Sequence, residues 1–131
     1  IIEEGSPMRT TDKPTQSMEA YVADILSAKL AMMTNLGRVS TGRDKIFSFQ
    51  NELQSLLQII ISYVELPDVK LIYATLTLLH SLVPMVHQPS CKEKVVSAFV
   101  SNTMAACFNA AARAEDLGVI SKALSLVQLL S

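Results

Sequence analysis

The sequence has little of the material from which active sites and disulfide frameworks are built. Tryptophan is absent, and the 131 residues include only two cysteines, two histidines and four glycines. The glycines form no phosphate-cradling loop, and no Gly-x-Ser-x-Gly elbow accompanies the serines. Cys91 and Cys107 lie far apart among apolar residues. This is typical of reduced thiols in a cytoplasmic or nuclear protein and not of a secreted, disulfide-bonded one.

The other titratable residues make no catalytic or metal-binding pattern. His80, His87 and Cys91 follow one another at spacings that match no common zinc site. The adjacent acids Glu115–Asp116 are better explained by a helix start than by a general acid/base pair. Cys91 beside Lys92 has a position that favours thiolate, but we interpret it as an incidental residue of a first helical turn. We therefore predict a protein that is not an enzyme and uses no cofactor, metal or small-molecule substrate.

Charged residues are also scarce: they make up 18% of the chain against a usual quarter or so, and the net charge is −1. The basic group Arg38, Arg43 and Lys45 is too small to suggest a nucleic-acid partner. Half of the residues are hydrophobic, and the mean hydropathy of +0.33 is high for a soluble protein. Such a chain either enters a membrane or belongs to an assembly that covers its faces. Because it starts on Ile1 and stops at Ser131 inside an apolar pattern, we interpret it as a fragment of a larger protein.

The chain divides into a polar leader and a long helical region. Residues 1–16 are polar, contain two prolines and show no period, so we predict a disordered leader or linker. From residue 17 onward apolar residues recur every three or four positions, which predicts an all-α domain over 17–131. Short connections between long helices predict antiparallel neighbours. We expect about five helices, at 17–36, 44–65, 67–83, 91–111 and 116–131.

Residues with a preference for helix ends support these boundaries. A side-chain oxygen at the N-cap accepts a backbone N–H, a glycine suits the position after the last turn, and proline suits the first. The expected signals are Ser17 and Gly37 at the two ends of the first helix, the capping boxes Thr41 with Asp44 and Ser90 with Glu93, Pro67 with Asp68 at the start of the third helix, Pro84 at its end, and Asp116 before the fifth.

Each helix shows an apolar stripe that we expect to face inward. The third helix is apolar on most sides and is predicted to be buried on most sides. The β-branched run 59–64 favours a strand locally, but the two-sided pattern around it favours a helix. The stripes are Tyr21, Val22, Ile25, Leu26, Ala28, Met32, Met33 and Leu36; Ile46, Phe49, Leu53, Leu56, Leu57, Ile60, Tyr63 and Val64; and Val119, Ile120, Leu124, Val127 and Leu130.

The third and fifth helices repeat one another at an offset of 48 residues. Asp68 falls on Asp116, Leu71 on Val119, and the segment from Leu76 on that from Leu124. The helices before them align under the same shift, though only as helices. This predicts two helix–turn–helix units, about 44–83 and 91–131, with the helix 17–36 as a leading half unit. A period of 48 lies at the upper edge of that of HEAT and armadillo repeats.

The segment 66–82, LPDVKLIYATLTLLHSL, resembles the second helix of a HEAT/armadillo repeat in its Pro-Asp entry and leucine spacing. The resemblance implies an α-solenoid in which each unit stacks on the next. It also implies a non-catalytic scaffold that binds another protein, or further repeats of the same chain, on the face lined by the second helices. The residues expected to bind the partner are Lys70, Tyr73, Thr77, His80 and Ser81 on the third helix and Leu126 and Leu129 on the fifth.

Two alternatives involve the apolar surface. The apolar run 71–86 is shorter than a membrane span, contains His80 and Pro84, and has Asp68 and Lys70 at its entrance, so we do not favour a membrane-spanning helix. A compact helical bundle that homodimerises, or that docks on a membrane surface, is the second functional hypothesis.

The last helix is apolar around much of its circumference. Leu117, Leu126 and Leu129 lie off its apolar stripe, and Lys122 is the only charge after Asp116. Leaving two or three leucines in water forgoes several kcal/mol at about 25 cal/mol per Å² of apolar surface. We therefore expect residues 116–131 to contact something outside this chain: a further repeat, a second copy or a partner.

Overall fold

The computed structural model describes residues 18–131, and every regular element within them is helical. The all-α prediction is confirmed. The leader 1–16 and the N-cap Ser17 lie outside the described residues. The elements are α2 (Met18–Arg38), α3 (Ser40–Ser48), α4 (Gln50–Ile61), the 3-10 turn η2 (Ser62–Glu65), α5 (Val69–Ser81), the 3-10 turn η3 (Val83–His87), α6 (Glu93–Arg113) and α7 (Leu117–Leu130).

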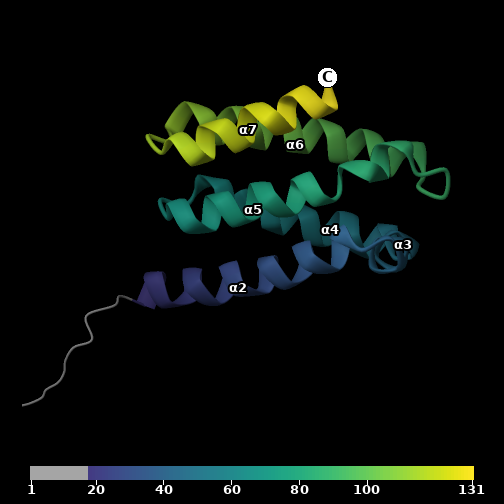
Figure 1. Ribbon diagram of the computed structural model, residues 1–131, viewed down its shortest axis with the longest axis horizontal. Helices are drawn as coiled ribbons and strands as arrows, with labels where there is room; N and C mark the ends of the chain where they lie inside the picture. Colours follow the sequence, from purple (N-terminus) through teal and green to yellow (C-terminus); the bar gives the residue numbers. More distant parts are fainter. Residues whose placement is uncertain (1–17) are drawn as a thin grey trace, which may run out of the picture.

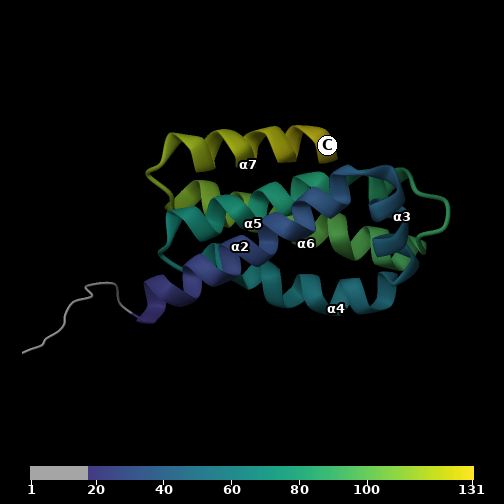
Figure 2. The ribbon, with the colours of Figure 1, turned by 60° about the horizontal axis from the view of Figure 1, so that its bottom comes forward.

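The long helices lie in two layers. Helices α2, α5 and α7 lie side by side with α5 in the middle, and α4 and α6 pack on one another behind them (Figure 1; Figure 2). Helix α7 contacts both α5 and α6, so it closes the two layers at one end. Helix α2 contacts α5 and the short α3, and lies at the opposite end of its layer.

Helix α5 is the centre of the core, as its sequence predicts. Its buried residues form two adjacent rows, Leu71, Thr75, Leu78 and Leu82 in the first and Ile72, Leu76 and Leu79 in the second. The first row belongs to one core cluster with Leu57 and Ile60 of α4 and Val64 of η2. Thr75 fits into this apolar environment because its hydroxyl donates to the Leu71 carbonyl, 2.8 Å away. The helix ends at Ser81, shortly before Pro84, as expected.

The 48-residue repeat extends to the helix caps. Asp68 is the N-cap of α5 and accepts a hydrogen bond from the Leu71 N–H (2.9 Å), while Asp116 is the N-cap of α7 and accepts one from the Val119 N–H (3.0 Å). Pro67 therefore precedes the cap. This differs from our expectation that it takes the first helical position. The two capping bonds join residues that correspond under the same shift, so both helices start in the same way.

Both predicted capping boxes are wrong. Thr41 and Asp44 lie inside α3, which starts at Ser40 after a Val39 N-cap that makes no side-chain hydrogen bond. Helix α6 starts at Glu93 with Lys92 as its N-cap, again without a side-chain bond from the cap. At the start of α6, the Lys92 N–H donates instead to the side chain of Gln50 on α4.

The side chains of Gln50 and Arg113 form hydrogen bonds between α4–η2 and the α6 region, which are distant in the sequence. The Gln50 side chain, at the start of α4, donates to the Ser90 carbonyl (2.9 Å) and accepts from the Lys92 N–H (2.6 Å). At the other end, the Arg113 guanidinium donates to the carbonyls of Val64 (2.9 Å) and Glu65 (2.7 Å). These bonds satisfy backbone groups at a helix start and a helix end that have no partner in their own helix.

Gly37 does not stop the first helix. Helix α2 continues to Arg38, and none of the described glycines has a positive φ. A Cβ added at Gly37 would come within 3.1 Å of the Ser81 hydroxyl oxygen and 3.5 Å of a Leu82 methyl. Glycine is needed there because the end of α2 approaches the end of α5 closely, and not because the chain turns.

The predicted second helix is broken at Phe49, which separates α3 from α4. The break turns the two apolar faces relative to each other. Phe47 is therefore buried while Phe49 is exposed, which is the reverse of the predicted face, and Leu56 is exposed as well. The β-branched run that follows is helical, as predicted.

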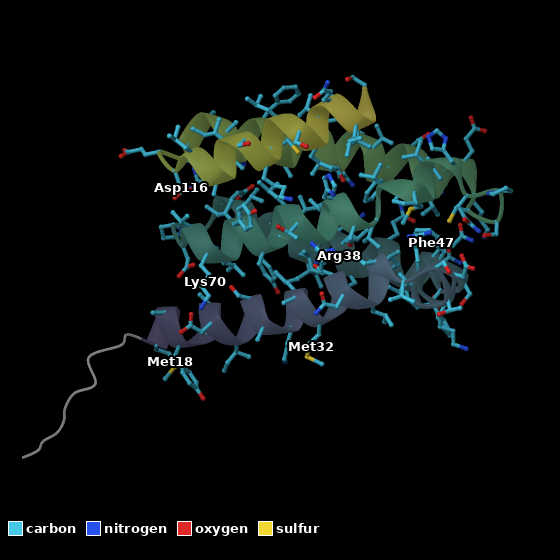
Figure 3. The ribbon with its side chains drawn as sticks, viewed as in Figure 1. Met18, Met32, Arg38, Phe47, Lys70 and Asp116 are labelled. Carbon is cyan, nitrogen blue, oxygen red and sulfur yellow. The ribbon has the colours of Figure 1, made fainter. Side chains whose placement is uncertain are left out.

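Helix α2 packs by the opposite side from the one predicted. Its buried residues are the smaller Ala23, Ser27, Leu30, Thr34 and Gly37. Six of the eight predicted core residues are exposed, and Leu26 and Met33 are half-buried. Small residues permit the close approach to α5, and the Thr34 hydroxyl donates to the Leu30 carbonyl (2.8 Å). The more apolar side faces away from α5, with Met18 and Met32 each 72% exposed (Figure 3).

Helix α7 repeats only one of the two buried rows of α5. Val119, Ala123 and Leu126 are buried and correspond under the 48-residue shift to Leu71, Thr75 and Leu78. Leu126 therefore lies on the packed side, contrary to our expectation. Leu124 corresponds to the fully buried Leu76 but is 58% exposed, so its place in the predicted stripe is also wrong. Helix α5 is covered on one side by α7. Among the described residues, no further helix covers the corresponding side of α7.

This pair of leucines gives a matched test of the packing. Leu76→Ala removes a fully buried side chain and should lower the free energy of unfolding by about 2–5 kcal/mol. Leu124→Ala, at the corresponding position of α7, should lower it by less than about 1 kcal/mol. Urea denaturation followed by circular dichroism measures both losses. Similar losses for the two variants would show that α7 is covered in solution.

Candidate interaction surface

A groove lined by polar and apolar residues lies between α2 and α5. Its volume is about 300 Å³. From α5 it takes Lys70, Tyr73 and Thr77, three of the residues that the sequence selected for partner binding. From α2 it takes residues that the sequence analysis did not select. The lining residues are Ser27, Ala31, Thr34, Asn35, Arg38, Lys70, Tyr73, Ala74 and Thr77.

Lys70 lies at one end of this groove and bridges the two helices. Its ammonium nitrogen is 3.3 Å from an Asp24 carboxylate oxygen of α2. Both side chains are exposed, so the pair contributes little to stability. Figure 3 shows Lys70 on the edge of α5 that faces α2, and Arg38 near the other end of α2. A ligand in the groove would therefore lie between two cationic side chains.

Tyr73 connects the groove to α7. The Lys122 ammonium of α7 lies 5.6 Å from the centroid of the Tyr73 ring, and both the ring and the ammonium remain accessible to solvent. Such a cation–π contact is worth about 0.5–1 kcal/mol at an exposed site. It holds the ring in place without burying it. We call the surface formed by Arg38, Lys70, Tyr73, Thr77 and Lys122 on α2, α5 and α7 the three-helix face.

The other selected residues are less available to a partner. Thr77 and Ser81 are half-buried, and their hydroxyls donate to the carbonyls of Tyr73 (2.8 Å) and Leu78 (2.7 Å). Leu126 is fully buried in the core, so it cannot contact a partner and is removed from the predicted set. Leu129 is exposed on α7.

His80 is half-buried on α5 among cationic side chains. Burial lowers the pKa of its imidazole below the usual 6.5, and the positive charges of Lys122 on α7 and Arg38 on α2 lower it further. Three helices thus bring cationic side chains to one face. The neutral imidazole adds no charge to this face near pH 7.

Neither cysteine has the properties of a reactive thiol. Cys91 lies buried just before α6, and burial raises the pKa of its thiol. The expectation that its position favours thiolate is wrong, because loss of solvent outweighs the helix terminus and the neighbouring lysine. Burial raises the pKa of Cys107, in the middle of α6, to about 11.

Metal binding and membrane spanning are the other functions to consider. Within residues 18–131, no group of three His, Cys, Asp or Glu side chains could hold a metal ion. Two segments, Val69–His87 and Glu93–Arg113, have the length and composition of a membrane span. About half of Val69–His87 is buried inside the fold. The core helix of a soluble protein can have the same length and composition.

The chain was also compared with known proteins. No family model, no curated protein and no solved structure matches it. The residues of the three-helix face therefore provide the basis for a functional proposal.

The position of His80 predicts how stability depends on pH. Because its pKa is lower in the folded chain than the unfolded value of about 6.5, the folded state binds fewer protons and is destabilised as the pH falls below that value. The melting temperature of the wild type should therefore fall more than that of His80→Gln between about pH 7.5 and pH 5. His87→Gln, which replaces an exposed histidine of η3, is the control. Parallel falls in the wild type and His80→Gln would contradict the prediction.

Proposed function

We propose that this chain is a non-catalytic protein–protein interaction module, built as an α-solenoid of antiparallel helix pairs of the HEAT/armadillo type. The row α2–α5–α7 with α4 and α6 behind it supports this arrangement. So does the correspondence of the two Asp N-caps and of the buried rows below them. In such an assembly each unit covers part of the next, and the second helices of the units share one face.

The observation that carries the functional part is the composition of the three-helix face. The groove between α2 and α5 is lined by the exposed side chains of Lys70 and Tyr73. Lys122 of α7 lies against the Tyr73 ring. Aromatic and cationic side chains held on a rigid surface are the usual anchors of protein interfaces. The partner is therefore another protein, bound across α2, α5 and α7. The buried, protonated thiols suit a cytoplasmic or nuclear location.

A photo-crosslinking phenylalanine analogue placed at position 73 should capture this partner in cells. We expect a discrete protein adduct from position 73 and none from position 108, where Phe108 is exposed on α6. Lys70→Ala combined with Tyr73→Ala should then weaken binding of the captured protein by about ten-fold or more, because two anchors are lost. Isothermal titration calorimetry measures the affinity.

The matched control replaces an exposed lysine and an exposed aromatic residue elsewhere, Lys94→Ala with Phe108→Ala on α6. Both double variants should unfold at the same urea concentration as the wild type within about 0.5 M, since all four side chains are exposed. Equal affinities of the captured protein for the two double variants would remove the assignment of the three-helix face.

A helical bundle that homodimerises or docks on a membrane is the second candidate. The exposed apolar side of α2 favours it. Static light scattering separates a dimer from a monomer, and flotation with anionic liposomes reports membrane docking. A monomer that does not float favours the interaction module.

A further inference from the structure

One side of α2 has no helix packed on it among residues 18–131. The buried row of α2, Ala23, Ser27, Leu30 and Thr34, faces α5. The row immediately before it, Val22, Leu26, Lys29 and Met33, lies about 100° further round the helix. None of these four side chains is buried.

In α5 the same two rows are both buried. The first row of α5, Leu71 to Leu82, is covered by the second layer, and its second row, Ile72 to Leu79, lies on the side of α7. A shift of 49 residues places Val22 on Leu71 and Ala23 on Ile72. The open row of α2 therefore corresponds to the row of α5 that lies toward η2 and α6, the elements of the second layer that contact α5.

Two apolar grooves lie along this open row, one toward each end. The first has a volume of about 480 Å³ and is lined by Val22 and Leu26 together with Leu66, Pro67 and Leu71. The second, about 230 Å³, is lined by Met33 with Ile46, Phe49, Glu52, Leu53 and Leu56. We call the open row with these two grooves the α2 trough. It follows α2, whose 21 residues span about 30 Å.

Charge indicates which kind of helix fits the α2 trough. Lys29 is exposed in the middle of the open row, at the position that Leu78 occupies in α5. Glu52 lines the groove at the Met33 end. A helix in the trough must therefore place a carboxylate against Lys29 and, toward one end, a cation near Glu52. Asp68 lines the groove at the other end, so the carboxylate that pairs with Lys29 would set the register of the bound helix but not its direction.

The exposed apolar faces of α2 and α7 in a second copy do not meet this requirement. Pairing α2 with α2 of another copy brings the two Lys29 side chains together at the centre. Helix α7 exposes leucines, but its only charged side chain is Lys122. Like charges would then meet where the trough needs an opposite charge.

We propose that the α2 trough binds an amphipathic helix of a partner protein, with apolar residues at three- and four-residue spacing and a carboxylate that pairs with Lys29. The slot lies on a different side of α2 from the three-helix face, so it does not depend on that face binding a protein. It follows the helix-in-groove mode of recognition.

The test uses peptides derived from α4–η2, the apolar segment of this chain whose η2 end contacts α5. Four fluorescein-labelled peptides carry the sequence of residues 50–65, unchanged or with Leu53→Glu, Leu57→Glu or Ile60→Glu. They are titrated by fluorescence anisotropy against the 131-residue chain. We expect one glutamate peptide to bind more tightly than the others, and Lys29→Glu to raise its dissociation constant at least about ten-fold.

Two variants of the chain separate the charge pairing from general effects. Lys122→Glu makes the same charge change on the three-helix face and should leave peptide binding unchanged. Lys29→Leu makes the open row wholly apolar and should reverse the preference, so that the unchanged peptide binds more tightly than the glutamate peptides. Circular dichroism checks that each variant is folded.

The proposal is overturned if no peptide binds either the wild type or Lys29→Leu, or if Lys29→Glu binds the glutamate peptide as well as the wild type does. Self-association in sedimentation velocity that Met33→Glu abolishes would assign the trough to a second copy. Flotation with phosphatidylcholine vesicles that Met33→Glu abolishes would assign it to a lipid surface. Either result also overturns the proposal.

Discussion

Helix α5 buries two adjacent rows of side chains, and the other helices take their places from this double burial. On one side α5 contacts η2 and α6 of the second layer, and on another it contacts α7. The third side of α5 is closed by α2 through small residues and Gly37. Because hydrophobic burial is the main favourable term in folding, a 13-residue helix with three covered sides organises the whole chain. Only the edge that carries Lys70 and Tyr73 remains free for contact with other molecules.

Much of this arrangement could be predicted from the sequence, and the errors have identifiable causes. The helices, the ends set by Asp116 and Pro84, and the central place of α5 follow from periodicity and local chemistry. The role of Gly37 could not be predicted, because it depends on the approach of Ser81 and Leu82, which are distant along the chain. The same holds for the start of α6, where the Lys92 N–H bonds to Gln50 and not to a nearby capping side chain.

The interaction surface was only half visible in the sequence. A single helix pattern selects the polar edge of α5, including Lys70 and Tyr73, but it cannot reveal which residues of α2 and α7 lie beside that edge. Arg38 and Lys122 were missed for this reason. The face of α2 was assigned wrongly because the most apolar stripe was assumed to point inward, whereas close packing on α5 requires small side chains. The surplus of apolar residues on α2 therefore lies on its exposed side.

The side-chain bonds of Gln50 and Arg113 have a mechanical consequence. One ties the start of α4 to the start of α6, and the other ties the end of α6 to the end of η2. Hydrogen bonds at both ends oppose sliding of α4–η2 along α6. In the front layer, an exposed ion pair joins α2 to α5, and the Lys122–Tyr73 contact joins α7 to α5. Sliding of α4 along α6 would therefore break side-chain hydrogen bonds at both ends, whereas separation of α2 from α5 would break an exposed ion pair.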